Sequence, residues 1–184
     1  MRVWWLLFAV FLLLAAPAAG QRARRKKPAP AAAAAPPRVR TRADSLVLRA
    51  RALLADRHEA EALALCRRAL HDNPVQYEGL WRASVLCSHI GSRFSDETRQ
   101  QQYYDDALAF AARALEIHPD FATANYAMAL AIANDGSLAP LRGRLQARIR
   151  EKPYLDAAPR DEPNHADAWQ LLARWHFKTA NYTI

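Results

Sequence analysis

Residues 107–119, which read ALAFAARALEIHP, decide the fold of this chain, and residues 62–74 repeat them as ALALCRRALHDNP. In both blocks alanine occupies the first and eighth positions, and the last residue is proline. Small residues at this spacing lie on one face of a helix and let a second helix approach closely. Proline then ends the helix, because it has no backbone N–H and disfavours helical geometry in the preceding residue. The duplicated block therefore predicts a protein built from helical repeats.

The rest of the chain from residue 44 onward also has helical periodicity. Apolar residues recur three or four positions apart, and no stretch alternates between apolar and polar residues, so the sequence predicts an all-α fold. We expect helices over residues 44–54, 59–72, from beyond Pro74 to Gly91, from about 97 to 118, over 122–133, over 141–152 and over 164–179.

Particular residues predict where these helices begin and end. Residues 95–97 (Ser-Asp-Glu) supply an N-cap followed by an acid in the first turn. Gly91 is expected to be a C-cap, and residues 134–136 (Asn-Asp-Gly) are expected to stop the fifth helix. Pro153 and Pro159 are expected to interrupt the chain after the sixth helix.

The last predicted helix carries the most specific motif. Trp169, Leu172, Ala173 and His176 follow Pro163 at the spacing of Trp, Leu, a small residue and Tyr in the first helix of a tetratricopeptide repeat, which this helix resembles. The two alanine blocks resemble the second helix of the same repeat. The resemblance implies a solenoid of helical hairpins.

The repeat period is longer than the 34 residues usual for that motif. The repeat prolines Pro74, Pro119 and Pro163 are 45 and 44 residues apart. We expect the extra residues between the two helices of each repeat, around residues 91–102 and 135–144. HEAT repeats have periods near 45 as well, but the paired alanine blocks and the Trp169 motif favour the tetratricopeptide interpretation.

Residues 75–184 resemble the regulator of microtubule dynamics family. The resemblance rests on the extra residues of each repeat, on residues 78–84 (EGLWRAS) and on the motif that begins at Asn164 and ends at Asn181. Bacterial relatives in that family are exported tetratricopeptide-like proteins of little-known function. In the family the last helix is followed by another helix, whereas this sequence ends at Ile184, so we expect the last repeat to be incomplete.

Residues 1–20 have the composition of a secretory signal peptide. Arg2 precedes an apolar run over residues 3–16, and small residues follow, with cleavage expected after Ala18 or Gly20. The alternative is an uncleaved membrane anchor, but the apolar run is shorter than the roughly 20 residues that span a bilayer. The sequence therefore predicts export to the periplasm or cell envelope.

Residues 21–43 predict a disordered basic linker rich in alanine and proline. Residues 21–42 contain eight basic residues and no acidic one, and Arg2 is a ninth cation, so the remaining 17 cations face 18 acids. The domain at residues 44–184 thus has no excess positive charge for phosphate, and we expect no nucleic-acid partner. Two interpretations of the linker remain open: a solvated tether, or contact with an anionic membrane surface or envelope polymer.

Catalytic and cofactor signatures are absent from the sequence. The six histidines are scattered, no Cys-x-x-Cys motif occurs, and the five glycines form no phosphate-binding loop or nucleophile elbow. We therefore expect no enzyme activity, no metal and no cofactor.

The two cysteines have two possible states. Cys66 and Cys87 lie in consecutive predicted repeats, and export implies an oxidising compartment, so a disulfide between them is conceivable. The alternative is a pair of buried free thiols that pack as small hydrophobic residues.

The resemblance to tetratricopeptide arrays implies a concave groove lined by the first helices, which would hold a protein or peptide segment. The alternative for each groove position is an ordinary solvated face. The outward positions of those helices are Arg51, Arg82, His89, Tyr126, Gln170 and Arg174.

Two functions follow from these expectations. The first is an exported, non-enzymatic scaffold that binds a partner in this groove, and the second is a structural envelope component tethered by residues 21–42 without a groove ligand. The last helix also presents Trp169, Leu172, Trp175 and Phe177, which is more apolar surface than one packing face requires. We expect either further chain beyond residue 184 or an interface for self-association or a partner.

Overall fold

Seven α-helices make up most of residues 41–181, which are the residues that the computed structural model describes. All of them belong to one unit that spans Val39–Ile184. The predicted signal peptide and almost all of the predicted linker lie outside the described residues. The helices are α1 (Arg42–Ala55), α2 (Glu59–Asp72), α3 (Tyr77–Gly91), α4 (Glu97–Ile117), α5 (Ala122–Leu138), α6 (Leu141–Asp161) and α7 (Ala166–Ala180).

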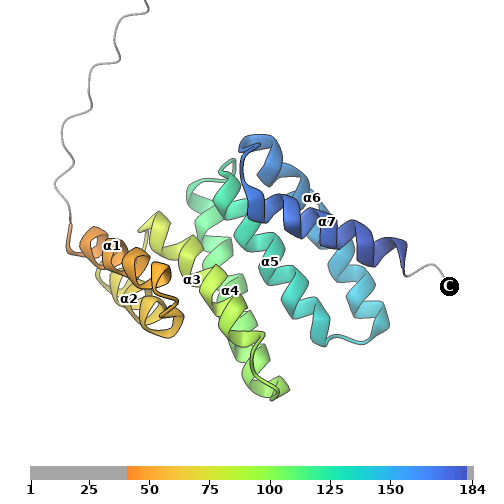
Figure 1. Cartoon of the computed structure of the whole chain (residues 1–184), viewed down its shortest axis with the longest axis horizontal. Coiled ribbons are helices and arrows are strands. Elements are labelled where there is room, and N and C mark those ends of the chain that lie inside the picture. Colours follow the sequence, from red (N-terminus) through yellow and green to blue (C-terminus); the bar gives the residue numbers. More distant parts are fainter. Residues whose placement is uncertain (1–40, 182–184) are drawn as a thin grey trace, which may run out of the picture. The chain divides into compact units, whose positions relative to one another are not determined.

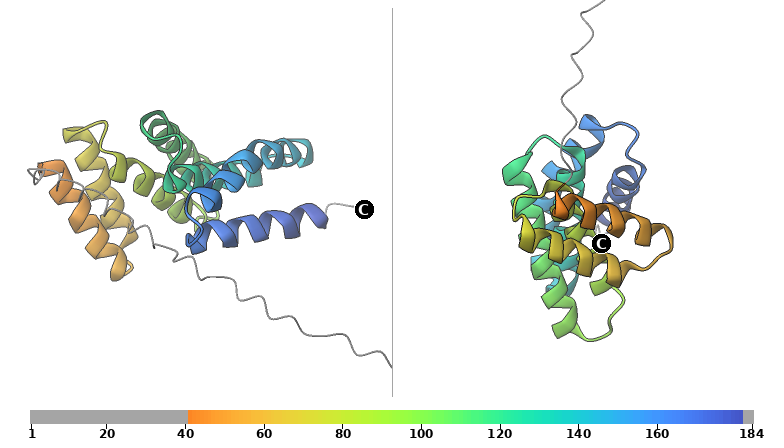
Figure 2. Two further views of the ribbon diagram at one scale, coloured as in Figure 1. Left: turned by 90° about the horizontal axis from the view of Figure 1, so that it is seen from above. Right: turned by 90° about the vertical axis from the view of Figure 1, so that its left-hand side faces the viewer.

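The helices pack as consecutive hairpins, so the predicted all-α fold is confirmed. Within the described residues α1 packs on α2, α3 on α4, and α5 on α6, while α3 also contacts α5 and α7 packs on both α6 and α5 (Figures 1 and 2). Since α3, α5 and α7 are each the first helix after a repeat proline, this order brings the equivalent helices of successive hairpins next to one another.

Alanines of the two duplicated blocks lie where the helices approach most closely. Ala62 and Ala69 in α2, and Ala107 and Ala114 in α4, are fully buried. One hydrophobic cluster joins Ala62, Ala107 and Ala114 to Leu80 and its neighbours in α3. Ala69 packs against α1. The prediction that these positions form the packing face is confirmed.

Three helices end in the same backbone conformation. Asn73, His118 and Glu162 each precede a repeat proline and have φ between −141° and −135° with ψ between 83° and 96°. A proline disfavours helical geometry in the residue before it, so each helix ends one residue before that position. The prolines predicted to end these helices therefore do so.

The N-terminal ends of α1 and α4 are held by side-chain caps. Thr41 Oγ1 accepts from the backbone N–H of Asp44 at 3.1 Å, and the Asp44 carboxylate accepts from the Thr41 N–H at 2.9 Å. This capping box starts α1 at Arg42, slightly before the predicted boundary between linker and domain. Asp96 caps α4 as predicted, with its carboxylate 2.7 Å from the Arg99 nitrogen.

Gly91 does not act as the predicted C-cap. It is the last residue of α3, Ser92 is the cap, and no glycine among the described residues has a positive φ. Gly91 serves close packing instead, because a Cβ there would lie 2.8 Å from the Tyr104 ring and 2.9 Å from Tyr103 Cβ.

The predicted stop at residues 134–136 is wrong, since α5 continues to Leu138. Tertiary contacts outweigh the turn propensity of Asn-Asp-Gly here. Asn134 Nδ2 donates to the Ser88 carbonyl at 3.2 Å, and Asp135 accepts from Gln101 Nε2 at 2.9 Å. These bonds join the last turns of α5 to α3 and α4.

The predicted interruptions at Pro153 and Pro159 are also wrong, since α6 runs without a break to Asp161. A proline inside a helix costs about 3 kcal/mol. Burial of Leu155 and Ala158, together with Pro159 itself, offsets that cost.

The extra residues of each repeat are helical and do not form long insertions between helices. α4 and α6 have 21 residues each, compared with 14 in α2. The connections at residues 92–96 and 139–140 are short.

Within the described part of the chain, no helix combines the length and apolar character needed to cross a membrane.

Candidate functional site

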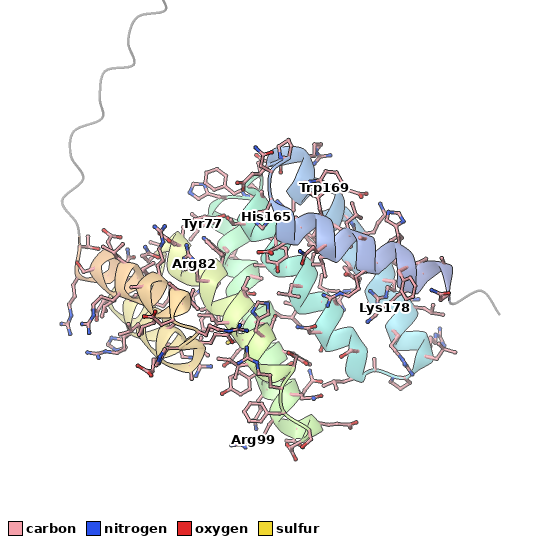
Figure 3. The ribbon with its side chains drawn as sticks, in the orientation of Figure 1. Tyr77, Arg82, Arg99, His165, Trp169 and Lys178 are labelled. Carbon is pink, nitrogen blue, oxygen red and sulfur yellow. The ribbon has the colours of Figure 1, made fainter. Side chains whose placement is uncertain are left out.

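A cleft of about 450 Å³ lies between α3, α5 and α7. Its floor is apolar, and polar side chains from all three helices surround it. Figure 3 shows the side chains of α7, with His165 and Trp169 in its N-terminal part and Lys178 toward its other end. The cleft is lined by His89, Ser92, Tyr126, Leu130, Asn134, Asp167, Gln170, Leu171 and Arg174.

Four of the six predicted groove residues line this single cleft. They are His89 from α3, Tyr126 from α5, and Gln170 and Arg174 from α7. These residues come from the first helices of three different repeats, and the packing of α3, α5 and α7 brings them together.

Arg51 and Arg82 are not among the cleft residues. Both contact the same carboxylate oxygen, Glu78 Oε1: Arg82 Nη2 at 2.8 Å and Arg51 Nε at 3.6 Å. The Arg82 guanidinium also lies over the Trp81 ring, 4.3 Å from its centroid. These two arginines therefore have partners inside the protein, at the junction of α1 and α3.

Tyr126 places a protonated hydroxyl at the cleft. Its ring is largely buried and lies 5.0 Å from the His165 ring. Burial, with a smaller contribution from the Asp167 charge, raises the pKa of Tyr126 to about 12, although Arg174 lowers it. At neutral pH the hydroxyl can therefore donate a hydrogen bond to a ligand.

The cleft carries one fixed charge of each sign. Burial by the surrounding helices lowers the pKa of His89, so this ring is neutral at pH 7. Asp167 and Arg174 are both exposed, and neither has an ion pair within the described residues. A carboxylate and a guanidinium are thus both available to a ligand, alongside the Gln170 amide.

Sequence reasoning missed Asp167, Asn134 and the apolar floor. Asp167, Gln170 and Arg174 are at positions i, i+3 and i+7 of α7, which lie on one helical face. That spacing would have identified Asp167 once Gln170 and Arg174 were chosen. No sequence signal identified Asn134, because its residue type indicated the end of a helix.

A second polar recess surrounds a buried carboxylate on α6. Glu151 is 1% exposed; its Oε2 accepts from Arg148 Nη1 at 3.0 Å, and its Oε1 has no hydrogen-bond partner. Burial raises the pKa of Glu151 to about 7, although Arg148, Arg174 and Lys178 lower it. Arg144 and Lys178 also line this recess of about 90 Å³.

Cys66 and Cys87 are free thiols in the structure, which agrees with the alternative of two buried residues that pack as small hydrophobic groups. Both are fully buried in the same hydrophobic cluster. Burial raises the pKa of the Cys66 thiol to about 11 and that of Cys87 to about 12.

Residues 41–181 contain no group of three or more metal-ligating side chains placed to hold an ion.

The four apolar residues of α7 divide into two pairs. Leu172 and Trp175 are half-buried against α5 and α6, and Trp175 Nε1 donates to the Arg148 carbonyl at 3.1 Å. Trp169 is 49% exposed and Phe177 is 71% exposed. The expected excess of apolar surface on this helix therefore consists of Trp169 and Phe177.

Comparison with known proteins identifies the family. A search of curated proteins found no match. Residues 46–184 match the family described as Regulator of microtubule dynamics protein 1-3, which extends the resemblance seen in the sequence to include the first hairpin. Since this match covers most of the chain, the protein belongs to the Regulator of microtubule dynamics protein 1-3 family.

Proposed function

We propose that this protein is an exported, non-enzymatic scaffold of the tetratricopeptide type, and that it holds a protein or peptide segment in the cleft between α3, α5 and α7. The observation that carries this proposal is that His89, Tyr126, Gln170 and Arg174, chosen as groove positions of three repeats, line one cleft. In this interpretation α1–α2, α3–α4 and α5–α6 are three repeats, of which the second and third are extended, and α7 is the first helix of a fourth.

The chemistry of the cleft suits an extended segment with an acidic side chain. The Arg174 guanidinium binds a carboxylate, and the Gln170 amide pairs with the donor and acceptor of a peptide bond. The Tyr126 hydroxyl donates to a backbone carbonyl, and the Asp167 carboxylate accepts from a backbone N–H or an ammonium group. Leu130 and Leu171 supply an apolar floor for one side chain.

The proposal is tested with a peptide selected on the whole chain. A random peptide library is displayed, the binders are enriched on the wild-type protein, and the affinity of the best binder is measured for each variant. We expect Arg174→Ala to weaken binding by about tenfold or more, because a charge-assisted hydrogen bond is lost. Gln170→Ala should weaken binding less.

The matched control is Arg68→Ala. Arg68 is an exposed arginine on α2 that lines a separate groove between α1 and α2. Its removal should leave the affinity unchanged. Equal affinity of wild type, Arg174→Ala and Gln170→Ala for the selected peptide would overturn the proposal.

Export is the second part of the proposal, and it rests on residues 1–20 of the sequence. The expected product is a chain that begins at residue 19 or 21, recovered from the periplasm or envelope and tethered or solvated through the basic segment that follows. N-terminal sequencing of the protein from each cell fraction measures both properties. A full-length chain confined to the cytoplasm would contradict export.

A further inference from the structure

The first half of α6 exposes a row of large aliphatic side chains. Leu141 is 55% exposed, Leu145 is 44% exposed and Ile149 is 67% exposed. Because they are four residues apart, they lie along one side of the helix and form a ridge. Ala147 and Ala158, which are buried, project from the other side of α6 toward the rest of the domain. The ridge of Leu141, Leu145 and Ile149 therefore faces solvent.

Unpaired cations lie on the same half of α6 as this ridge. Arg142, Arg144 and Arg150 are exposed, and within residues 41–181 no ion pair involves any of them. Residues 141–150 contain no acidic residue. The other cations of this stretch are paired, Arg148 with Glu151 and Lys152 with Asp156. The uncompensated positive charge is thus confined to the part of α6 that carries the ridge.

We propose that the first half of α6 docks this protein on an anionic lipid surface. A helix that lies in the bilayer interface has this composition, with an apolar stripe that enters the acyl boundary and arginines at its sides that meet lipid phosphates. Leu141, Leu145 and Ile149 are the inserting side chains. Arg142 and Arg144 flank them and contact the headgroups, and Arg150, which lies toward α4 and α5, adds to the positive charge near the surface. This surface is separate from the cleft between α3, α5 and α7, and docking does not depend on a ligand there.

The charges distinguish this occupant from a second copy of the chain. Two copies that pair through this ridge would bring three unpaired arginines against three others, which is unfavourable. The ridge is also convex and contains no aromatic residue, whereas protein hot spots concentrate Trp, Tyr and Arg in packed pockets. Residues 21–42 add eight cations without an acid, and peripheral attachment is stronger where two weak signals combine.

A fluorescent probe on the ridge tests the proposal in the whole chain. Ile149→Cys is labelled with an environment-sensitive dye; the native Cys66 and Cys87 are fully buried, so the dye reacts at position 149. Val75→Cys is the matched control, because Val75 is also 67% exposed but lies in the connection between α2 and α3. We expect phosphatidylglycerol vesicles to shift the emission of the probe at residue 149 to the blue, and phosphatidylcholine vesicles to leave it unchanged.

Charge reversal then separates lipid docking from other occupants. Arg142→Glu with Arg144→Glu should weaken vesicle binding of the residue 149 probe by more than about tenfold, since each cation near the surface contributes separately. The matched pair Arg49→Glu with Arg68→Glu, on the first hairpin, should have a much smaller effect.

Four outcomes would overturn the proposal. The first is an equal shift at residues 75 and 149, which indicates that another segment inserts. The second is a shift unaffected by reversal of Arg142 and Arg144. The third is a shift that grows with protein concentration without vesicles, which assigns the ridge to a second copy. The fourth is a larger shift with polyglutamate than with anionic vesicles, which assigns the ridge to an acidic protein.

Discussion

Gly136 of α5 and Ala147 of α6 lie so close together that a Cβ on Gly136 would be 2.2 Å from the Cβ of Ala147. No pair of carbon atoms tolerates that distance, so the absence of a side chain at residue 136 sets how closely the third hairpin closes. The same two residues line the recess next to the buried Glu151.

Gly136→Ala should therefore destabilise the fold, although alanine is the better helix former by about 1 kcal/mol. Overpacking costs about 1–3 kcal/mol, so we expect a net loss measured by urea unfolding. Ala147→Gly in the same chain removes the clash. The double variant should be more stable than the sum of the single changes predicts, and strict additivity would contradict this packing.

Glu151 should make stability fall as the pH rises. Burial raises its pKa from the ordinary 4.5 to about 7, so the folded chain holds a proton in that interval that the unfolded chain has released. The contribution of Glu151 to the free energy of unfolding is fully present below pH 4.5 and is lost as the pH rises through about 7. The total change in the free energy of unfolding is up to about 3 kcal/mol.

Unfolding measured from pH 4 to pH 8 checks this expectation. Glu151→Gln should remove this pH dependence. Above pH 7 the variant should have a higher free energy of unfolding than wild type. Asp156→Asn, which removes an exposed carboxylate from the same helix, controls for the change in net charge. A wild-type profile parallel to that of Glu151→Gln across the whole range would show that the carboxyl group is not buried as described.

The two cysteines should react only after unfolding. Both thiols are fully buried, and burial raises the pKa of Cys66 to about 11 and that of Cys87 to about 12, so neither forms much thiolate at neutral pH. We expect a thiol reagent to find almost no reactive thiol in the native protein and two per chain in denaturant. No thiol in denaturant without a reductant would mean that the two residues form a disulfide after all.

The hydroxyl of Tyr77 joins α3 to α5 through Thr123 Oγ1, 2.7 Å away. Tyr77→Phe keeps the edge-to-face ring contacts with His118 and Phe121 but removes this hydrogen bond. We expect a loss of about 0.5–1.5 kcal/mol in the free energy of unfolding. If Tyr77→Phe lowers the free energy of unfolding by the same amount in a chain that carries Thr123→Val, the Tyr77–Thr123 hydrogen bond is not the cause of the loss.

The sequence predicted the elements that depend on local signals. The prolines at 74, 119 and 163 act on the residue before them, and Asp96 caps a helix three residues away, so neighbouring residues suffice to predict these helix ends. The stop at residues 134–136 was wrong because distant partners on α3 and α4 hold that turn in the helix. Local propensity contains no information about such partners.

The candidate site was predicted only in part, for a similar reason. Periodicity placed Tyr126, Gln170 and Arg174 on the outward faces of their helices, and three equivalent helices then aligned them. It also placed Arg51 and Arg82 there, but both of these arginines form ion pairs with the Glu78 carboxylate. Whether an outward arginine is open to a ligand depends on carboxylates from neighbouring helices, which spacing within one helix does not reveal.

The central claim is tested most directly by an NMR titration. The selected peptide is added to the labelled protein, and the amide chemical shifts are recorded. A peptide in the proposed cleft should shift the amides of Ser92 at the C-cap of α3, Tyr126 on α5, and Asp167 and Gln170 on α7. These changes should disappear in Arg174→Ala. Changes confined to the groove of α1 and α2, around Ala52 and Ala64, would contradict the assignment of this cleft as the binding site.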